Sequence, residues 1–297
     1  MCVRTFFVAC LAVLSPLAAG DDTASGFQKP TAAPAAEATS IELPMELLAS
    51  RPLIRVKING QGPFGFLLDP EATQTLIDAR LVETLKLVPL KYADGTSARL
   101  VDLELGKSSL TNVVYESRDL SRVVPELGPS AQPRGVLSLS AWPDQLVTLD
   151  YTKWRVTIEP GALSDPDAKA TFALGPTPQL FVALSIGERT FRCHVDPLYP
   201  GGLLLPADSL LEFPLAEPAR DDGAMYTRRG LTAIRLARLE TEVMVGDFTF
   251  KTPQVQFGGS GHDAILGWQW LADFSLTYDV SHGRVRLDQP KRSTASR

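Results

Sequence analysis

Cysteine is nearly absent from the chain, which has three cysteines among 297 residues. Cys2 and Cys10 both fall in a segment that we expect to be removed from the mature protein. Only Cys193 would then remain, and a single cysteine cannot form an internal disulfide. Because Cys193 stands in an apolar, strand-like stretch, we expect it to be a small buried residue, and not a reactive thiol.

Positive charge is also scarce, since 29 Lys and Arg against 34 Asp and Glu give a formal net charge of −5. Nucleic acid is excluded as the main partner, because a protein that binds phosphates needs a basic surface. The chain contains no Gly-x-Ser-x-Gly sequence and no P-loop sequence that ends in Gly-Lys-Ser/Thr. These absences argue against a serine hydrolase and against nucleotide binding, and we expect no cofactor.

No apolar run is long enough to suggest a stable membrane span. The most apolar run lies in residues 1–20, where Arg4 precedes an apolar core and small residues follow. This arrangement predicts a secretory signal peptide that is cleaved after Ala19 or Gly20, and hence export to the periplasm or out of the cell. Cys10 leaves a lipoprotein signal as an alternative. We expect residues 21–40 to be a flexible linker and residues 290–297 a tail.

The sequence does contain many segments that are typical of β-strands. Apolar residues alternate or cluster in "LIRVKI", "FGFLLD", "QLVTLDY" and "LFVALSI", and the 22 glycines and 23 prolines suit short strands joined by turns. Two short helices are expected, one after the capping residue Asp78 and one with Pro206 in its first turn. Asp94-Gly95, within residues 92–100, is expected at the tip of a hairpin that covers a cleft.

The first of two repeated blocks ends in an Asp-Pro pair. Residues 53–69 align without a gap on residues 180–196, and this alignment pairs Asp69 with Asp196. Each aspartate stands at the end of an apolar strand and is followed by proline.

The second repeated block aligns residues 135–158 without a gap on residues 264–287 and pairs Thr148 with Thr277. Because two blocks match in the same order, the sequence predicts an internal duplication within a single, monomeric chain. We expect one lobe over residues 41–160, a connection over 161–178 and a second lobe over 179–289.

Both repeated blocks resemble the aspartic peptidases, in particular bacterial retropepsin-like proteins arranged as two pepsin-like lobes. The resemblance rests on "PLIRVKINGQGPFGFLLD" followed by "LIDARLVETL", on "PGGLLLP" after Asp196, and on "GVLS" and "AILG". It implies a mostly β protein with two pseudo-symmetric closed-barrel lobes and a peptide-binding cleft between them. It also implies that Asp69 and Asp196 share a proton, one acting as base on a water and the other as acid toward the scissile carbonyl.

The loops after the two aspartates depart from the Asp-Thr-Gly pattern of that family. Pro70 and Pro197 stand where the family has a hydroxyl residue, and they lack both the hydroxyl and an amide hydrogen. Glu71 and Leu198 stand at the positions of the family glycine. We therefore expect a protein that binds peptide but cleaves it weakly or not at all. An active endopeptidase that uses Asp69 and Asp196 is the alternative, and a third hypothesis makes both residues plain turn formers.

Two further expectations concern histidine and tryptophan. His194, Asp196 and His262 form an alternative set of metal ligands, although we favour a hydrogen-bonded histidine and no metal. The four tryptophans of the repeated blocks are expected to pack in the core or between the lobes: Trp142, Trp154, Trp268 and Trp270.

Overall fold

A computed structural model describes residues 5–6, 40–91, 97–124, 127–175, 178–227, 230–258 and 261–289. Three predicted features lie outside the described residues: the rest of the expected signal peptide and linker, the tail, and the hairpin tip at Asp94-Gly95. Among the described residues, no helix combines the length and the apolar character that crossing a membrane requires.

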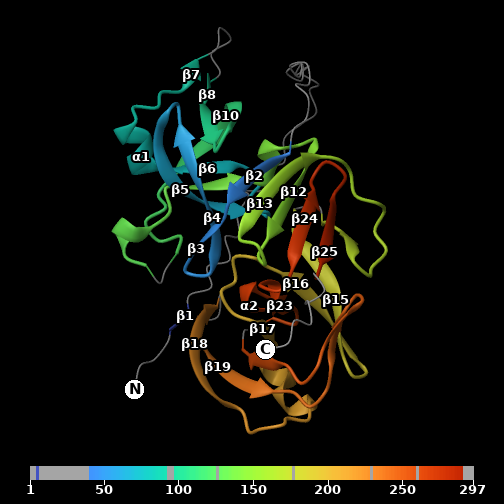
Figure 1. Cartoon of the computed structure of the whole chain (residues 1–297). Coiled ribbons are helices and arrows are strands. Elements are labelled where there is room, and N and C mark those ends of the chain that lie inside the picture. Colours follow the sequence, from blue (N-terminus) through green and yellow to red (C-terminus); the bar gives the residue numbers. More distant parts are fainter. Residues whose placement is uncertain are drawn as a thin grey trace, which may run out of the picture.

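Most of the described chain is in strands, as the sequence predicts (Figure 1). The strands up to residue 160 are β1 (Thr5–Phe6), β2 (Ile41–Pro44), β3 (Glu46–Leu48), β4 (Arg51–Ile58), β5 (Gln61–Asp69), β6 (Thr75–Asp78), β7 (Leu90–Lys91), β8 (Ser97–Ala98), β9 (Leu100–Leu105), β10 (Ser108–Arg118), β11 (Gly135–Ser138), β12 (Gln145–Asp150) and β13 (Arg155–Pro160). Those that follow are β14 (Thr171–Ala173), β15 (Leu180–Ile186), β16 (Arg189–Val195), β17 (Leu203–Leu205), β18 (Arg220–Thr227), β19 (Gly230–Arg238), β20 (Val243–Val245), β21 (Phe248–Phe250), β22 (Gln254–Phe257), β23 (Ala264–Leu266), β24 (Ser275–Asp279) and β25 (Arg284–Asp288).

The helical elements are short. They are the α-helices α1 (Ala79–Thr84) and α2 (Trp268–Leu271) and the 3-10 helices η1 (Pro129–Ala131), η2 (Leu139–Ala141) and η3 (Ala207–Glu212). The side chain of Asp78 accepts a hydrogen bond from the backbone N–H of Arg80, which confirms the predicted cap of α1. The predicted helix near Pro206 is present as the 3-10 helix η3, and Pro206 precedes its first residue.

A closed six-stranded barrel forms the first half of the molecule. Its order is β4-β5-β11-β6-β10-β9, and pairing of β9 with β4 closes the ring. Strand β11 lies between β5 and β6, parallel to β5 and antiparallel to β6. The end of β5, which carries Asp69, is therefore held by a strand that arrives from far along the chain.

The second half is built on an open ten-stranded sheet, in the order β1-β18-β19-β22-β17-β23-β16-β15-β20-β21. Strand β23 lies between β16 and β17, parallel to β16 and antiparallel to β17. The prediction of a second closed barrel is therefore wrong, because no pairing among the described residues closes this sheet. The hairpin β20–β21 pairs with β15, whereas in the first barrel β9 takes the corresponding place beside β4.

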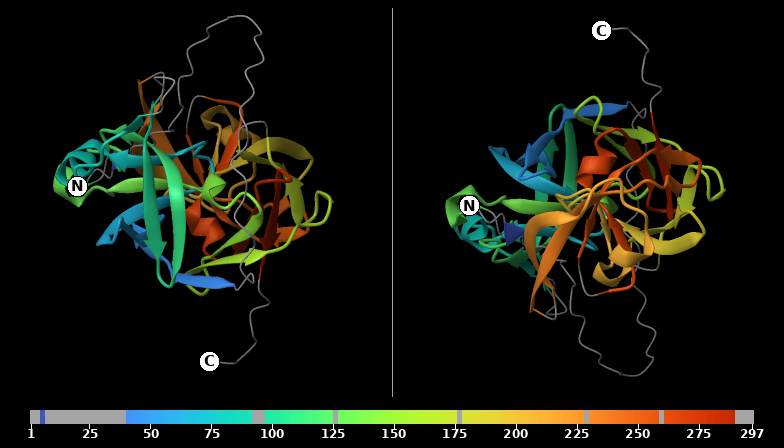
Figure 2. Two further views of the ribbon diagram at one scale, coloured as in Figure 1. Left: turned by 90° about the horizontal axis from the view of Figure 1, so that it is seen from above. Right: turned by 90° about the horizontal axis from the view of Figure 1, so that it is seen from below.

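Strands from both halves combine in a six-stranded sheet, with the order β14-β25-β24-β12-β13-β2. Strands β12 and β24 pair antiparallel with Thr148 opposite Thr277, and the two hydroxyl oxygens lie 2.9 Å apart. Figure 2, in which the molecule is seen from above and from below, shows this sheet beside the barrel.

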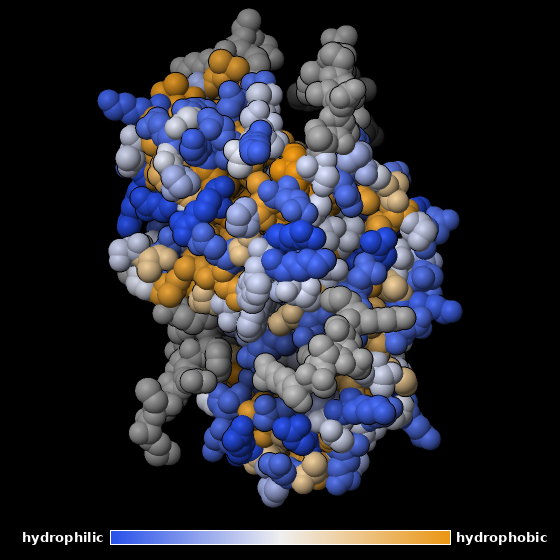
Figure 3. All heavy atoms as spheres, viewed as in Figure 1, coloured by the Kyte–Doolittle hydropathy of each residue, from blue (hydrophilic) through white to orange (hydrophobic). Residues whose placement is uncertain are grey.

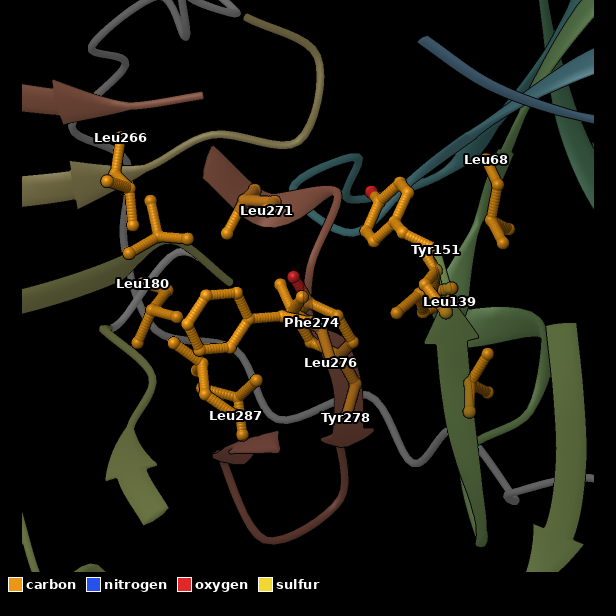
Figure 4. Close-up of a cluster of buried hydrophobic side chains, with 14 of the residues drawn as sticks. Leu68, Leu139, Tyr151, Leu180, Leu266, Leu271, Phe274, Leu276, Tyr278 and Leu287 are labelled. Atoms are coloured by element: carbon orange, nitrogen blue, oxygen red, sulfur yellow. The ribbon is translucent and has the colours of Figure 1, made fainter. Parts of the chain in front are cut away.

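One apolar core runs through both halves. Figure 4 shows Leu68, Leu139 and Tyr151 of the first half facing Leu271 and Phe274 of the second. All five side chains are buried and belong to the same cluster of contacting residues. Separation of the halves would expose apolar surface on each of them, which makes them energetically interdependent.

The surface in Figure 3 is mostly polar, with apolar side chains gathered in separate spots. Trp154 is 46% exposed, so the prediction that it packs in the core or between lobes is wrong. Its positive φ of 55° places it in the turn between β12 and β13, where the side chain is directed outward. Trp142 is buried, and Trp268 and Trp270 are partly buried against the core.

Candidate functional site

Two aspartates stand at the ends of corresponding strands. Asp69 is the last residue of β5, whose preceding residues Phe66, Leu67 and Leu68 are fully buried. Asp196 directly follows β16, and its backbone N–H donates to the carbonyl of Leu266 in β23. A strand buried on both faces can carry a carboxyl group into the interior only at its end, where loop amides can bind it.

The two Asp-Pro loops have the same hydrogen bonds. The N–H of Glu71 donates to Oδ1 of Asp69, and the N–H of Leu198 donates to Oδ1 of Asp196, each at 2.8 Å. The carbonyl of Asp69 accepts from Ala72, and that of Asp196 accepts from Tyr199. The amide that proline cannot supply is thus replaced, in both loops, by the amide of the following residue.

Asp69 is 6% exposed and has the more strongly altered proton affinity of the two. Burial raises the pKa of Asp69 to about 7, and the negative charges of Glu71 and Asp196 act in the same direction. The structure therefore brings Asp69 and Asp196 close enough for the charge of one to bear on the other.

Asp196 is partly buried and differs from Asp69 by having a cation beside it. Burial and the charge of Glu71 raise the pKa of Asp196, while the nearby His194 opposes that rise. The charge of His194 thus favours the ionised form of Asp196, whereas the two neighbouring charges named for Asp69 disfavour its ionised form.

Glu71 connects the first loop to the second half of the molecule. One carboxylate oxygen contacts Nε2 of His194, and the other accepts from Nε2 of Gln179 at 3.3 Å. From the sequence, Glu71 is expected only as a residue at the position of the family glycine, and His194 as a metal ligand or a hydrogen-bonded residue. No local sequence pattern predicts the contact between these two side chains.

Two buried tyrosines lie near the carboxyl groups and were also missed. Burial and the charge of Asp196 raise the pKa of Tyr151 far above its usual value, so this phenol stays protonated. Its hydroxyl has no hydrogen-bond partner among the described residues. Burial also raises the pKa of Tyr278, with contributions from Tyr151 and the carboxylates. The only sequence signal is their place in the second repeated block, beside Asp150 and Asp279.

The strands behind the two loops support them in different ways. In the second half, a Cβ atom at Gly267 would lie 2.4 Å from the Tyr199 ring, so this position has no room for a larger residue. In the first half, Ser138 takes the matching place, and its hydroxyl donates to the carbonyl of Ala72 in the Asp69 loop. The serine thus replaces close packing with a hydrogen bond.

The metal alternative has no structural counterpart. Within the part of the chain that the structure describes, no group of three or more His, Cys, Asp or Glu side chains is placed to hold a metal ion. His262 is exposed, and His194 is engaged by Glu71. Cys193 is fully buried, as predicted, and burial raises the pKa of its thiol, which keeps it unreactive.

A buried carboxyl pair of this kind can act as an acid and a base in one step. No protein-family model matches the chain, and no curated protein matches it. The function has to be inferred from these residues and their surroundings.

Proposed function

We propose that this chain is an exported aspartic-peptidase-like protein that binds extended peptide between its halves and cleaves it weakly or not at all. The observation that carries this proposal is the pair of Asp-Pro loops with matching hydrogen bonds, which place Asp69 and Asp196 within reach of each other's charge. Plain turn-forming aspartates would not need to be buried or to lie within reach of each other's charge.

The strand pairings support an origin by internal duplication. Strand β11 pairs parallel with β5 and antiparallel with β6. In the same way, β23 pairs parallel with β16 and antiparallel with β17. Thr148 and Thr277, which the alignment of the repeated blocks pairs, also lie directly opposite each other in the shared sheet. This register is what a local two-fold axis between the halves would produce. We propose that residues 41–160 and 179–289 are the two lobes.

Weak catalysis follows from the charges around the pair. A working pair carries one proton and one negative charge in the resting state. Here the Glu71 carboxylate adds a second negative charge, which raises the pKa values of Asp69 and Asp196. Ionisation of Asp196, the group that would remove a proton from water, is thereby disfavoured.

An active endopeptidase is the second candidate, and the difference between the two aspartates favours it. Asp196 lies near His194, whose charge favours the ionised form of its carboxyl group, and it could accept a proton from the attacking water. Asp69, with its pKa raised to about 7, could donate its proton to the peptide carbonyl oxygen. The water oxygen would thereby bond to the peptide carbon and give a tetrahedral gem-diol. The C–N bond would then break as the amine takes the proton held by Asp196 and a gem-diol hydroxyl returns a proton to Asp69, which leaves a carboxylic acid product.

The experiment uses the purified chain without residues 1–20 and an unfolded polypeptide, from about pH 3 to about pH 8. Binding of the polypeptide is expected, with slow cleavage or none. Inhibitors with a hydroxyl group at the position of the scissile carbonyl should bind, and Asp69→Asn and Asp196→Asn should weaken that binding.

Robust cleavage that both Asn variants abolish would establish the active alternative. Absence of both binding and cleavage would contradict the proposal. Protein recovered outside the cytoplasm should begin near Gly20 or Asp21, and an intact Met1 on it would contradict export with cleavage.

A further inference from the structure

Glu71 belongs to the loop of the first half, but its side chain ends in the second half. Its side chain is 21% exposed, and the His194 side chain that it contacts is 8% exposed. Gln179, which holds its other oxygen, precedes β15 of the second half. Two contacts from one carboxylate therefore cross the boundary next to Asp69 and Asp196.

His194 is a well-anchored partner. It lies on β16, two residues before Asp196, and its ring stacks on Phe181 of β15 with 5.0 Å between centroids. The guanidinium of Arg192 lies over the same Phe181 ring at 3.5 Å and is paired with Asp263. A ring packed in this way keeps its Nε2 directed at Glu71.

We propose that Glu71 is a positioning residue, whose carboxylate holds the loop of Asp69 against the strand that leads to Asp196. The proposal rests on the function proposed above for the two aspartates and deepens it. Pro70 and Pro197 cannot donate hydrogen bonds across the boundary, so the loops need another link. The Glu71–His194 contact supplies that link with a buried, charge-assisted hydrogen bond.

The charges that face this contact determine how it responds to pH. Burial lowers the pKa of His194. The hydrogen bond and the charge of Glu71 raise it, as do the charges of Asp196 and Asp263, and the net shift is upward. The ion pair is therefore complete below the usual pKa of histidine and is lost as pH rises through the raised one. When His194 loses its proton, the charge of Glu71 acts uncompensated on Asp69 and Asp196.

The test follows each group by NMR, through the side-chain carboxyl carbons of Asp69 and Asp196 and the ring of His194. In Glu71→Gln the titration midpoints of Asp69 and His194 should both fall, that of His194 by about one pH unit. Glu71→Leu should act similarly. It reproduces the Asp-Pro-Leu sequence of the second loop, in which the amide of Leu198 binds Asp196.

Glu71→Asp should keep part of the effect, because the charge remains on a shorter side chain. Glu46→Gln, which breaks an exposed pair with Arg55, is the matched control and should move none of these midpoints. A merely structural role for Glu71 would change stability but leave the midpoints of the surviving groups in place.

Unchanged midpoints of Asp69 and His194 in folded Glu71→Gln would overturn the proposal. If the Glu71 variants do not fold, His194→Gln leaves Glu71 in place and should raise the midpoints of Asp69 and Asp196. Unchanged midpoints there would equally overturn it. Cleavage assayed in parallel separates the two proposals, since shifted midpoints without binding or cleavage of peptide would leave the role of Glu71 standing and remove the peptidase-like function.

Discussion

Asp69 and Asp78 are two buried aspartates, at the ends of consecutive strands, with different tasks. Asp78 accepts hydrogen bonds from the backbone of Arg80 and Leu120 and lies 3.9 Å from a guanidinium nitrogen of Arg134. Asp69 has the negative charges of Glu71 and Asp196 nearby, and both raise its pKa. The hydrogen bonds of Asp78 stabilise the fold around it, whereas the surroundings of Asp69 disfavour its ionised form, so ionisation of Asp69 costs stability.

This contrast predicts opposite effects of two matched substitutions. The pKa of Asp69 is raised to about 7 in the folded state, so its stabilising effect is full below the usual pKa near 4 and is lost as pH rises to about 7. A rise of about three units in this pKa corresponds to at most about 4 kcal/mol in the free energy of unfolding. Asp69→Asn should therefore be more stable than the natural chain at about pH 8.

Asp78→Asn should be less stable at the same pH, by about 1 kcal/mol or more, because its amide nitrogen cannot accept one of the two hydrogen bonds that Asp78 accepts from the backbone of Arg80 and Leu120. Urea denaturation at about pH 8 and about pH 4 measures both variants. The gain of Asp69→Asn should shrink at the lower pH. Loss of stability in Asp69→Asn at the higher pH would show that its carboxylate is better solvated than the structure indicates.

The two aspartates could be proposed from sequence because each is marked locally, by the end of an apolar strand and a following proline. The contact between Glu71 and His194 joins residues 123 positions apart, and no periodicity or motif encodes such a pairing. Trp154 shows the same limit at one residue. Its place in the second repeated block suggests a packed side chain, but Trp154 lies in the turn between β12 and β13, where its ring is exposed.

At the scale of elements, the fit of β11 between β5 and β6 depends on one glycine. Gly135 pairs with Phe66, and a Cβ atom at residue 135 would lie 2.1 Å from the Phe66 ring. Phe66 is fully buried, so its ring has little room to move. Gly135→Ala should therefore cost about 1–3 kcal/mol through overpacking.

A second substitution tests that explanation. Phe66→Leu should recover part of the loss when it is combined with Gly135→Ala, because it removes the ring carbons that clash. Gly128→Ala is the control, since nothing lies within 4 Å of a Cβ atom there. Thermal unfolding is compared for the natural chain, the two single variants, the double variant and the control, and additive losses in the double variant would contradict the clash.

The element order was only partly accessible from sequence. Apolar residues marked β4, β5, β12 and β15, but not the long strands β10, β18 and β19, and a capping aspartate marked α1. The partner of each strand was not encoded locally. The hairpin β20–β21 is an example, because only the folded chain shows that it lies beside β15. The closed first barrel depends likewise on the long-range pairing of β4 with β9.

At the scale of the whole molecule, the shared sheet and the large apolar cluster that spans both halves predict cooperative unfolding. Circular dichroism and tryptophan fluorescence should report one coincident transition in urea. Residues 41–160 produced alone should not reach the native fold, because β12 would lack β24 and apolar core side chains would be exposed. Two separate transitions, or a stable isolated half, would show that the halves are independent domains.

The antiparallel pairing of β12 with β24 also imposes an order on assembly. During synthesis or passage through an export channel, β12 emerges long before Ser275–Asp279, the segment that pairs with it. Until then, β12 presents an unpaired edge that can join with the edge of another chain. Strands β24 and β25, near the end of the polypeptide, thus complete a sheet that begins with β2 at Ile41. Premature termination before residue 275 would yield an aggregation-prone product, and not a smaller working protein.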